Sequence, residues 1–212
     1  NLCNEFGLEL QNNQFDTHLI YKGNYYKKNE WDYSEDWNKK FKAIIDHYPK
    51  LTQAEKLKID KMDWWRFLVN NGCEGRDLDI RELLDSTDFG ETIRSVSAFA
   101  ALAEYAESSE KNEMDLKIKG GNSMLAKKIA DKIGNDKIKL QHAVSRVVQN
   151  SKGGVTVYCN NGQKFTADKI ICTAPTFAVK KIKWEPGLPV DQVNAMNELQ
   201  YARINKNPIV FK

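Results

Sequence analysis

The first half of the chain has a hydrophobic pattern with helical periodicity. Between Ser34 and Tyr48 the apolar residues fall on one helical face and the charged residues on the other, which predicts an amphipathic helix. Pro49 ends this helix, because the residue before a proline avoids the α region. Thr52 and Glu55 have the spacing of a capping box, so a second helix is expected to follow.

Shorter elements surround these two helices. Two β-prone runs flank Lys22-Gly23, which is typical of a hairpin. Asp63 precedes a short apolar helix, and Asp88 is the expected N-cap of an alanine-rich helix, with Thr87 as the competing choice. The other predictions for this half are a helix at residues 1–6 capped by Gly7, a strand at 8–11, and helices at 64–69, 78–84 and 93–106.

The pattern changes after Glu113. Residues 144–148, 155–159 and 164–167 alternate apolar and polar positions between Gly-containing turns, and they predict a three-stranded antiparallel meander. Residues 169–173, which include Cys172, are apolar on both faces and predict a strand inside a covered sheet. The other predictions are strands at 116–118, 137–140 and 203–211 and helices at 124–133, capped by Gly134, and at 191–199. The whole pattern indicates a mixed protein, α+β or α/β, with an organisational break near residue 114.

Composition narrows the possible functions. The chain has 212 residues, 41% of them hydrophobic, which allows one or two domains. Its net charge of +3 gives no argument for a nucleic-acid partner or an anionic membrane. No apolar run approaches the ~20 residues that a transmembrane helix needs. Because the four cysteines fit no zinc or redox spacing, we expect reduced thiols and a cytoplasmic location. The three histidines are far apart in sequence, so no metal site is predicted.

Gly120-Gly121 is the first candidate for chemistry. It separates a predicted strand from a predicted helix, a place where the backbone can turn sharply or approach a phosphate. The pair is not part of a GxGxxG motif, so a tight structural turn is the favoured interpretation.

The order of motifs from Gly120 onward resembles the flavin-containing amine oxidase family, which includes monoamine oxidase-like proteins. In that family a GG…L helix leads to a strand whose valine lies near the adenine of FAD, then to an AD-x-(V/I)-(V/I)-x-(A/T)-x-P strand and an F/W-x-P-x-LP segment. The matching stretches here are Gly120-Gly121 with its helix, Val144, residues 167–175 and residues 184–189. The resemblance covers essentially the whole chain, and it is most specific from Gly120 to Lys206.

The resemblance implies a domain organisation. Residues 1–114 would form the helical portion of a substrate-binding domain, with its hairpin. Residues 115–180 would form part of an FAD-binding domain that contains the meander, and residues 181–212 would return to the sheet of the substrate domain. The implied cofactor is FAD, and the implied substrates are a small-molecule amine and O₂, with the amine C–N bond oxidised to an imine.

The resemblance also implies roles for single residues. The backbone of Val144 would hydrogen-bond the adenine edge, and Thr173, Ala174 and Pro175 would run past the dinucleotide. Lys206 is the implied catalytic residue. It would correspond to the lysine that holds a water against flavin N5 in many amine oxidases, where a fixed cation stabilises the negative charge of the reduced flavin. Met114 would line the substrate cavity.

Two family parts are not found in the printed sequence. The strand-GxGxxG-helix that binds the FAD pyrophosphate does not occur, and neither does the C-terminal segment that closes over the isoalloxazine. We therefore expect the central part of a longer enzyme, which by itself binds FAD weakly or not at all and lacks oxidase activity. Two alternatives stay open: a related flavin desaturase or porphyrinogen oxidase, and a non-catalytic α+β binding module.

Overall fold

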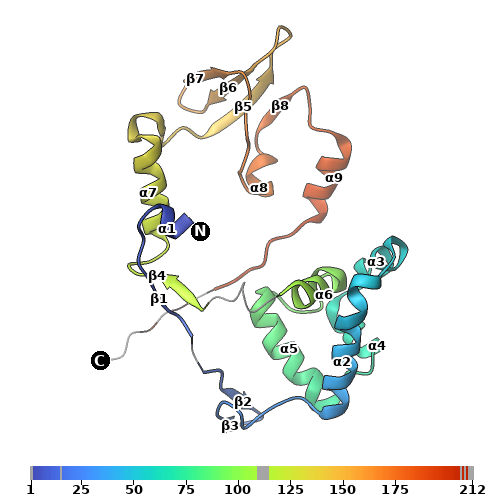
Figure 1. Cartoon of the computed structure of the whole chain (residues 1–212). Helices are drawn as coiled ribbons and strands as arrows, with labels where there is room; N and C mark the ends of the chain where they lie inside the picture. The colour runs from blue at the N-terminus through green and yellow to red at the C-terminus, as the bar shows by residue number, and fades with distance from the viewer. Residues whose placement is uncertain (1, 15, 109–114, 206, 208, 210–212) are drawn as a thin grey trace. The chain divides into compact units, whose positions relative to one another are not determined.

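The computed structural model describes residues 2–14, 16–108, 115–205, 207 and 209. They form two compact units (Figure 1). One unit contains the residues before Ser123 together with those after Tyr201, and the other is Ser123–Tyr201. Both contain helices and strands, so the prediction of a mixed α+β protein is confirmed. The functional assignment of the predicted domains stays a prediction.

The first unit begins with small β elements. Helix α1 (Leu2–Glu5) ends at Gly7, whose φ of 61° is the left-handed conformation predicted for a cap. Strand β1 (Leu10–Asn12) pairs antiparallel with β4 (Leu116–Ile118). Strands β2 (Leu19–Tyr21) and β3 (Asn24–Tyr26) form the predicted hairpin around Lys22-Gly23.

The helices of this unit follow in chain order. They are α2 (Glu35–His47), the 3₁₀ helix η1 (Tyr48–Lys50), α3 (Gln53–Asp60), α4 (Trp64–Asn70), α5 (Gly75–Phe89) and α6 (Ala98–Glu107). Thr52 and Glu55 form the predicted capping box at the start of α3. The side chain of Asp63 accepts from the backbone N–H of Arg66 at 2.7 Å and caps α4.

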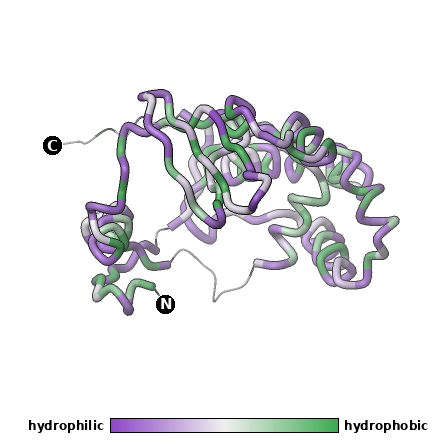
Figure 2. Tube along the Cα trace, turned by 90° about the horizontal axis from the view of Figure 1, so that it is seen from above, coloured by the Kyte–Doolittle hydropathy of each residue, from purple (hydrophilic) through white to green (hydrophobic). Residues whose placement is uncertain are grey.

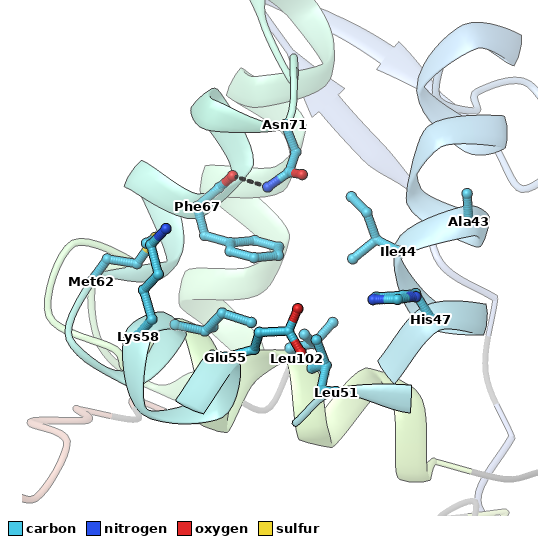
Figure 3. Close-up of a pocket in the computed structure, with 11 residues that line it drawn as sticks. Ala43, Ile44, His47, Leu51, Glu55, Lys58, Met62, Phe67, Asn71 and Leu102 are labelled. Atoms are coloured by element: carbon cyan, nitrogen blue, oxygen red, sulfur yellow. Dashed lines mark hydrogen bonds between the residues drawn. The ribbon is translucent and has the colours of Figure 1, made fainter. Parts of the chain in front are cut away.

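The apolar faces of these helices form the main core. Its buried members are Trp37, Trp64, Phe67, Leu68, Cys73, Ile93, Ala98, Ala101 and Leu102. Hydrophobic and hydrophilic positions interleave along the helices (Figure 2). None of the helices in the described part of the chain has both the length and the apolar character that crossing a membrane requires. On the surface of the bundle the helices leave a pocket of about 470 Å³ (Figure 3).

A buried polar cluster lies inside this core. The carboxylate of Asp85 accepts from the indole N–H of Trp64 at 2.6 Å and from the hydroxyl of Tyr105 at 2.7 Å. Arg81, one helical turn earlier, lies 3.5 Å from the same carboxylate. The guanidinium of Arg81 also lies 3.9 Å from the ring centroid of Phe41 and 4.5 Å from that of Tyr33. Burial raises the pKa of Asp85, and the charge of Arg81 opposes that rise.

The prediction that Asp88 caps the alanine-rich helix is wrong. Asp88 lies inside α5, which is longer than the predicted 78–84 helix and ends at Gly90, with φ of 69°. A Cβ at position 90 would overlap the side chain of Ile204. The N-cap of α6 is Ser97, whose hydroxyl accepts from Ala100 N–H at 3.2 Å.

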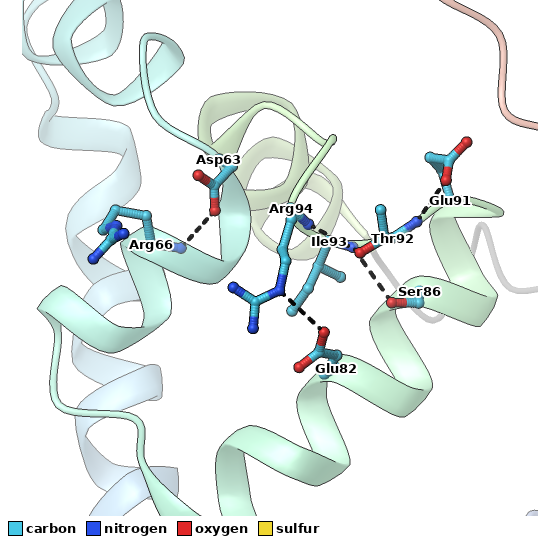
Figure 4. Close-up of polar contacts among 8 residues, drawn as sticks. All are labelled: Asp63, Arg66, Glu82, Ser86, Glu91, Thr92, Ile93 and Arg94. Carbon is cyan, nitrogen blue, oxygen red and sulfur yellow. Dashed lines mark hydrogen bonds and ion pairs between the residues drawn. The ribbon is translucent and has the colours of Figure 1, made fainter.

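Polar contacts hold the loop between α5 and α6 (Figure 4). The N–H of Ile93 donates to the hydroxyl of Ser86 at 3.3 Å, and Arg94 Nε lies 3.4 Å from Glu82. Ser97 has φ of −56° and ψ of 130°, which lies outside the helical region, so α6 begins at Ala98 and not at residue 93.

The second unit contains a four-stranded mixed sheet in the order β7-β6-β5-β8. Its elements are α7 (Ser123–Ile133), the 3₁₀ helix η3 (Asn135–Lys137), β5 (Val144–Gln149), β6 (Val155–Cys159), β7 (Lys164–Ala167), α8 (Thr176–Val179), β8 (Lys183–Glu185) and α9 (Val190–Glu198). Strands β5, β6 and β7 form the predicted antiparallel meander. Strand β8, which the pattern did not predict, pairs parallel to β5.

Two strand predictions are wrong, and a third lies partly outside the described residues. Residues 137–140 begin at the last residue of the 3₁₀ helix η3. The N–H groups of Lys137 and Ile138 donate to the carbonyls of Gly134 and Asn135, so they are not available to a partner strand. Residues 169–173 have no strand partner among the described residues, and Ile171 is 89% exposed. An apolar run forms a strand only where a neighbouring strand supplies hydrogen bonds. Of residues 203–211, the described ones (203–205, 207 and 209) lie in no strand.

Replacing Asp85 tests the buried cluster. Asp85→Ala leaves Arg81 as an unpaired buried charge, so we expect it to lower the free energy of unfolding by about 3–5 kcal/mol. Urea unfolding followed by tryptophan fluorescence measures this. The control is Glu82→Ala on the same helix, which removes only an exposed ion pair worth about 1 kcal/mol or less. Equal losses in the two variants would contradict a structural role for the cluster.

Thiol reactivity tests the corrected position of Cys172. Cys172 is exposed, whereas Cys73 is 1% exposed and burial raises its pKa to about 12. At pH 8 in native protein we expect iodoacetamide to modify Cys172 at least about 100-fold faster than Cys73. Peptide mapping by mass spectrometry gives both rates. Protection of Cys172 equal to that of Cys73 would contradict its exposed position.

Candidate functional site

The second unit contains a cavity of about 550 Å³, a size typical of sites for small molecules and cofactors. Three stretches contribute to its lining, which consists of Ala143, Val144, Ser145 and Val147 at the start of β5, residues 170–174, and Ala178, Lys181, Ile182 and Trp184 around α8 and β8. Asn160, in the turn after β6, completes the wall. The cavity therefore lies where the first residues of β5 meet the segment that was expected to be a covered strand.

The start of β5 is held on one side only. The N–H of Asn160 donates to the carbonyl of Ala143 at 2.9 Å, and the hydroxyl of Ser145 donates to the carbonyl of Tyr158 at 3.2 Å. Strand β8 begins to pair with β5 only at Arg146. On the side away from β6, Val144 therefore has no strand neighbour among the described residues. Such an edge offers backbone hydrogen-bonding groups to a ligand.

The opposite wall is formed by small residues. Thr173 and Ala174 line the cavity, and Pro175 follows as the N-cap residue of α8. The carbonyl of Pro175 accepts from the N–H groups of Ala178 and Val179 at 2.8 and 3.0 Å, which fixes the turn of the chain out of the cavity wall. Small side chains at 173 and 174 leave room for a ligand to approach the backbone.

The cavity suits binding better than acid–base catalysis. The only ionisable side chains among its lining residues are Cys172 and Lys181. Apolar surface from Val144, Ile170 and Trp184 forms much of the remaining wall. The indole N–H of Trp184 donates to the carbonyl of Val179 at 3.3 Å, which orients the ring. A flat, largely uncharged heterocycle fits these surroundings.

The structure brings together three of the residues that the sequence predicted. Val144, Thr173 and Ala174 line the same cavity, whereas Pro175 lies next to it without lining it. Lys206 and Met114 lie outside the described residues, so their roles stay predictions.

Sequence reasoning missed other lining residues. Asn160 was part of a predicted turn, and Lys181 belongs to a basic pair that is typical of a solvated surface. Neither has a distinguishing local signal. Trp184 belongs to the Trp-Glu-Pro segment that was matched to the family, and that match was the available signal.

The described residues do not form a metal centre. No group of three or more His, Cys, Asp or Glu side chains among them could hold a metal ion.

Curated proteins match part of the chain. Lysine-specific histone demethylase 1 homolog 2 of Oryza sativa subsp. japonica is 32% identical over 94 residues, which are 43% of this chain and 12% of that protein. Probable polyamine oxidase 4 of Arabidopsis thaliana is 36% identical over 76 residues, which are 35% of this chain and 15% of that protein. The matched stretches are therefore a small part of these relatives.

Solved structures match the fold over most of the chain. Wild-type putrescine oxidase bound to putrescine has a TM-score of 0.76 at 20% identity, and the match covers 92% of this chain and 48% of that one. Cyclohexylamine oxidase from Brevibacterium oxydans IH-35A has a TM-score of 0.75 at 19% identity, with the same coverage. The chain thus spans about half the length of these structures.

The family model of flavin-containing amine oxidoreductases matches residues 1–212. Its match agrees with the fold shared with the two oxidases and with the motif order from Gly120 onward. The chain belongs to the flavin-containing amine oxidoreductase family.

Proposed function

We propose that the chain is part of an FAD-dependent amine oxidase and that the cavity beside β5 receives the adenine end of FAD. One observation carries this proposal. Val144 and the Thr173-Ala174 pair come from stretches about thirty residues apart, yet they line one cavity in a chain of a flavin-containing family.

The residues of the cavity fit an adenine ring. The open edge of β5 at Val144 offers backbone groups to the edge of the ring, as the sequence resemblance implied. Apolar side chains such as Ile170 and Val147 offer surface to its faces. Thr173 and Ala174 leave space for the sugar and phosphates to pass close to the backbone. In this proposal the chain binds and orients the cofactor at its adenine end.

The proposed reaction is oxidation of an amine C–N bond to an imine. FAD, when bound, would supply the acceptor for the two electrons that leave the amine, and O₂ would take up these electrons and the two protons released from carbon and nitrogen as hydrogen peroxide. The imine is then hydrolysed by water. The substrate is a small-molecule amine, and the proposed location is cytoplasmic.

Two further roles rest on the sequence resemblance. We propose that Lys206 holds a water near the reactive part of the flavin and supplies a fixed positive charge there. We propose that Met114 lines the substrate cavity, within a substrate-binding portion formed by the helical unit.

The proposal concerns a protein that carries this chain together with a pyrophosphate-binding segment. The printed sequence contains no GxGxxG motif, and the chain spans about half of the solved relatives. We propose that the 212 residues alone retain FAD weakly and lack oxidase activity, because the adenine end is only one part of the dinucleotide.

Two alternative functions make different demands on the structure. A flavin desaturase or porphyrinogen oxidase would use the same adenine site. It would differ from an amine oxidase in whether Lys206 promotes the reaction of the reduced flavin with O₂. A non-catalytic binding module would require an exposed apolar patch on the meander. Among the residues of β5, β6 and β7, only Phe165 is an exposed large hydrophobic residue, so no such patch favours this alternative.

Filling the cavity tests the site for FAD. Ala174→Leu adds bulk to the cavity wall at an exposed loop position, so the fold should tolerate it. In a protein that also carries the pyrophosphate-binding segment, we expect FAD to bind about tenfold or more weakly, a loss of ~1.4 kcal/mol. Fluorescence titration of the apoprotein with FAD measures this. Ala195→Leu, at an exposed position of α9, is the matched control. Unchanged affinity in the 174 variant would contradict the proposed adenine site.

Replacing Lys206 separates an oxidase from a desaturase. Lys206→Met removes the proposed cation, and we expect reoxidation of the reduced flavin by O₂ to slow by at least about tenfold. Stopped-flow absorbance of the flavin gives the rate. Lys152→Met, in the exposed turn between β5 and β6, is the control. An unchanged rate would count against the oxidase and favour the desaturase alternative.

A further inference from the structure

The helical unit has a second pocket that the proposed FAD site does not use. It has a volume of about 470 Å³ and lies among α2, α3, α4 and α6 (Figure 3). All of its lining residues belong to the unit that contains these helices. Its size falls within the range of sites for small organic ligands.

The floor of the pocket is apolar and formed by core residues. Phe67 is 8% exposed and Leu102 is 1% exposed, so both are held within the core. The ring of Phe67 stacks on Trp64, with centroids 5.3 Å apart and planes inclined by 13°. Figure 3 shows the Phe67 ring directed toward the middle of the lining residues. The pocket therefore offers a fixed aromatic surface to an apolar group.

The rim carries Glu55 and Lys58, whose opposite charges do not pair with each other, and the imidazole of His47 also lines the pocket. Glu55 and Lys58 are three residues apart on α3, a spacing that places their side chains on the same part of a helix surface. Nevertheless they form no ion pair with each other, and within the described chain neither has an ion-pair partner. In Figure 3 the Lys58 amine is directed away from the Glu55 carboxylate.

One carboxylate oxygen of Glu55 remains available. Oε2 accepts from the N–H of Thr52 at 2.8 Å and from its hydroxyl at 2.7 Å, whereas no contact with the described residues occupies Oε1. The bonds from Thr52 lower the pKa of Glu55, so the group is negative at neutral pH. Capping thus orients the carboxylate and leaves its second oxygen without a partner among the described residues.

We propose that this pocket binds a small zwitterion with an apolar tail, of which an aromatic α-amino acid is the simplest example. The ammonium group lies at Glu55, the carboxylate lies at Lys58, and the tail covers Phe67. A simple amine would satisfy Glu55 and leave Lys58 unmatched, and a simple acid would do the reverse. A ligand with both charges is complementary to both residues.

The test uses the 212-residue chain and three related probes without FAD. L-Phenylalanine has both charges, phenethylamine lacks the carboxylate, and 3-phenylpropanoate lacks the ammonium group. We expect calorimetric titration to give L-phenylalanine the highest affinity, about threefold to tenfold above either singly charged probe. Methyl NMR locates the site: signals of Ile44 and Ile59 in the pocket should shift, whereas that of the buried Ile80, outside the lining, should not.

Charge-removing variants assign the two ends of the ligand. Glu55→Gln keeps an oxygen for the capping box, and we expect it to weaken L-phenylalanine and phenethylamine by about threefold to tenfold and to leave the acid unchanged. Lys58→Met should weaken L-phenylalanine and the acid and spare the amine. The control is Lys61→Met, an exposed lysine just after α3 that does not line the pocket.

Several outcomes would overturn the proposal. These are no detectable binding of L-phenylalanine at 10 mM or so, binding that leaves the Ile44 and Ile59 signals in place, or equal affinity for all three probes. Circular dichroism of each variant checks that the helices remain folded. Failure here leaves the FAD proposal untouched, because the two sites share no residue.

Discussion

The burial of one carboxylate, that of Asp85, constrains the whole helical unit. A charged group in a core is costly unless it is paired and hydrogen-bonded. Here the donors come from α4 through Trp64 and from α6 through Tyr105, and the counter-charge comes from Arg81. Arg81 in turn lies against Phe41 of α2. Four helices are thus held at fixed positions around one charge, and the apolar floor of the surface pocket is fixed with them.

The shape of the second unit's cavity depends on backbone pairing and not on a buried charge. Its cavity depends on where backbone pairing stops, since β8 pairs with β5 from Arg146 onward and leaves Val144 with one neighbouring strand. The wall opposite is a loop of small residues that ends at the N-cap of α8. No buried ionisable cluster comparable to that of Asp85 occurs among the described residues of this unit. The lining of its cavity is therefore made mostly of backbone and apolar atoms.

Sequence signals that span only a few residues predicted the elements that form through contacts between nearby residues. The capping box of Thr52 and Glu55 and the alternation of the meander were sufficient for α3 and for β5 to β7. Residues 169–173 were predicted wrongly, because an apolar run indicates burial without indicating which strand will pair with it. Asp88 and Ser97 are both good caps, and only tertiary contacts decide between them. Val144, Thr173 and Ala174 were predicted through the motif order, and the structure places them in one cavity. Asn160 and Lys181 could not be found, because only the fold brings them to the cavity.

The way the chain divides has a consequence for the order of folding during synthesis. The first unit is discontinuous: the whole of Ser123–Tyr201 is made before residues 202–205 can return to it. Those returning residues place Ile204 against Gly90 and bring Arg203 within 3.6 Å of Glu91. The helical core, by contrast, is encoded entirely before residue 108. A nascent chain can therefore form that core early, while the contacts at the end of α5 must wait until the inserted unit has left the ribosome.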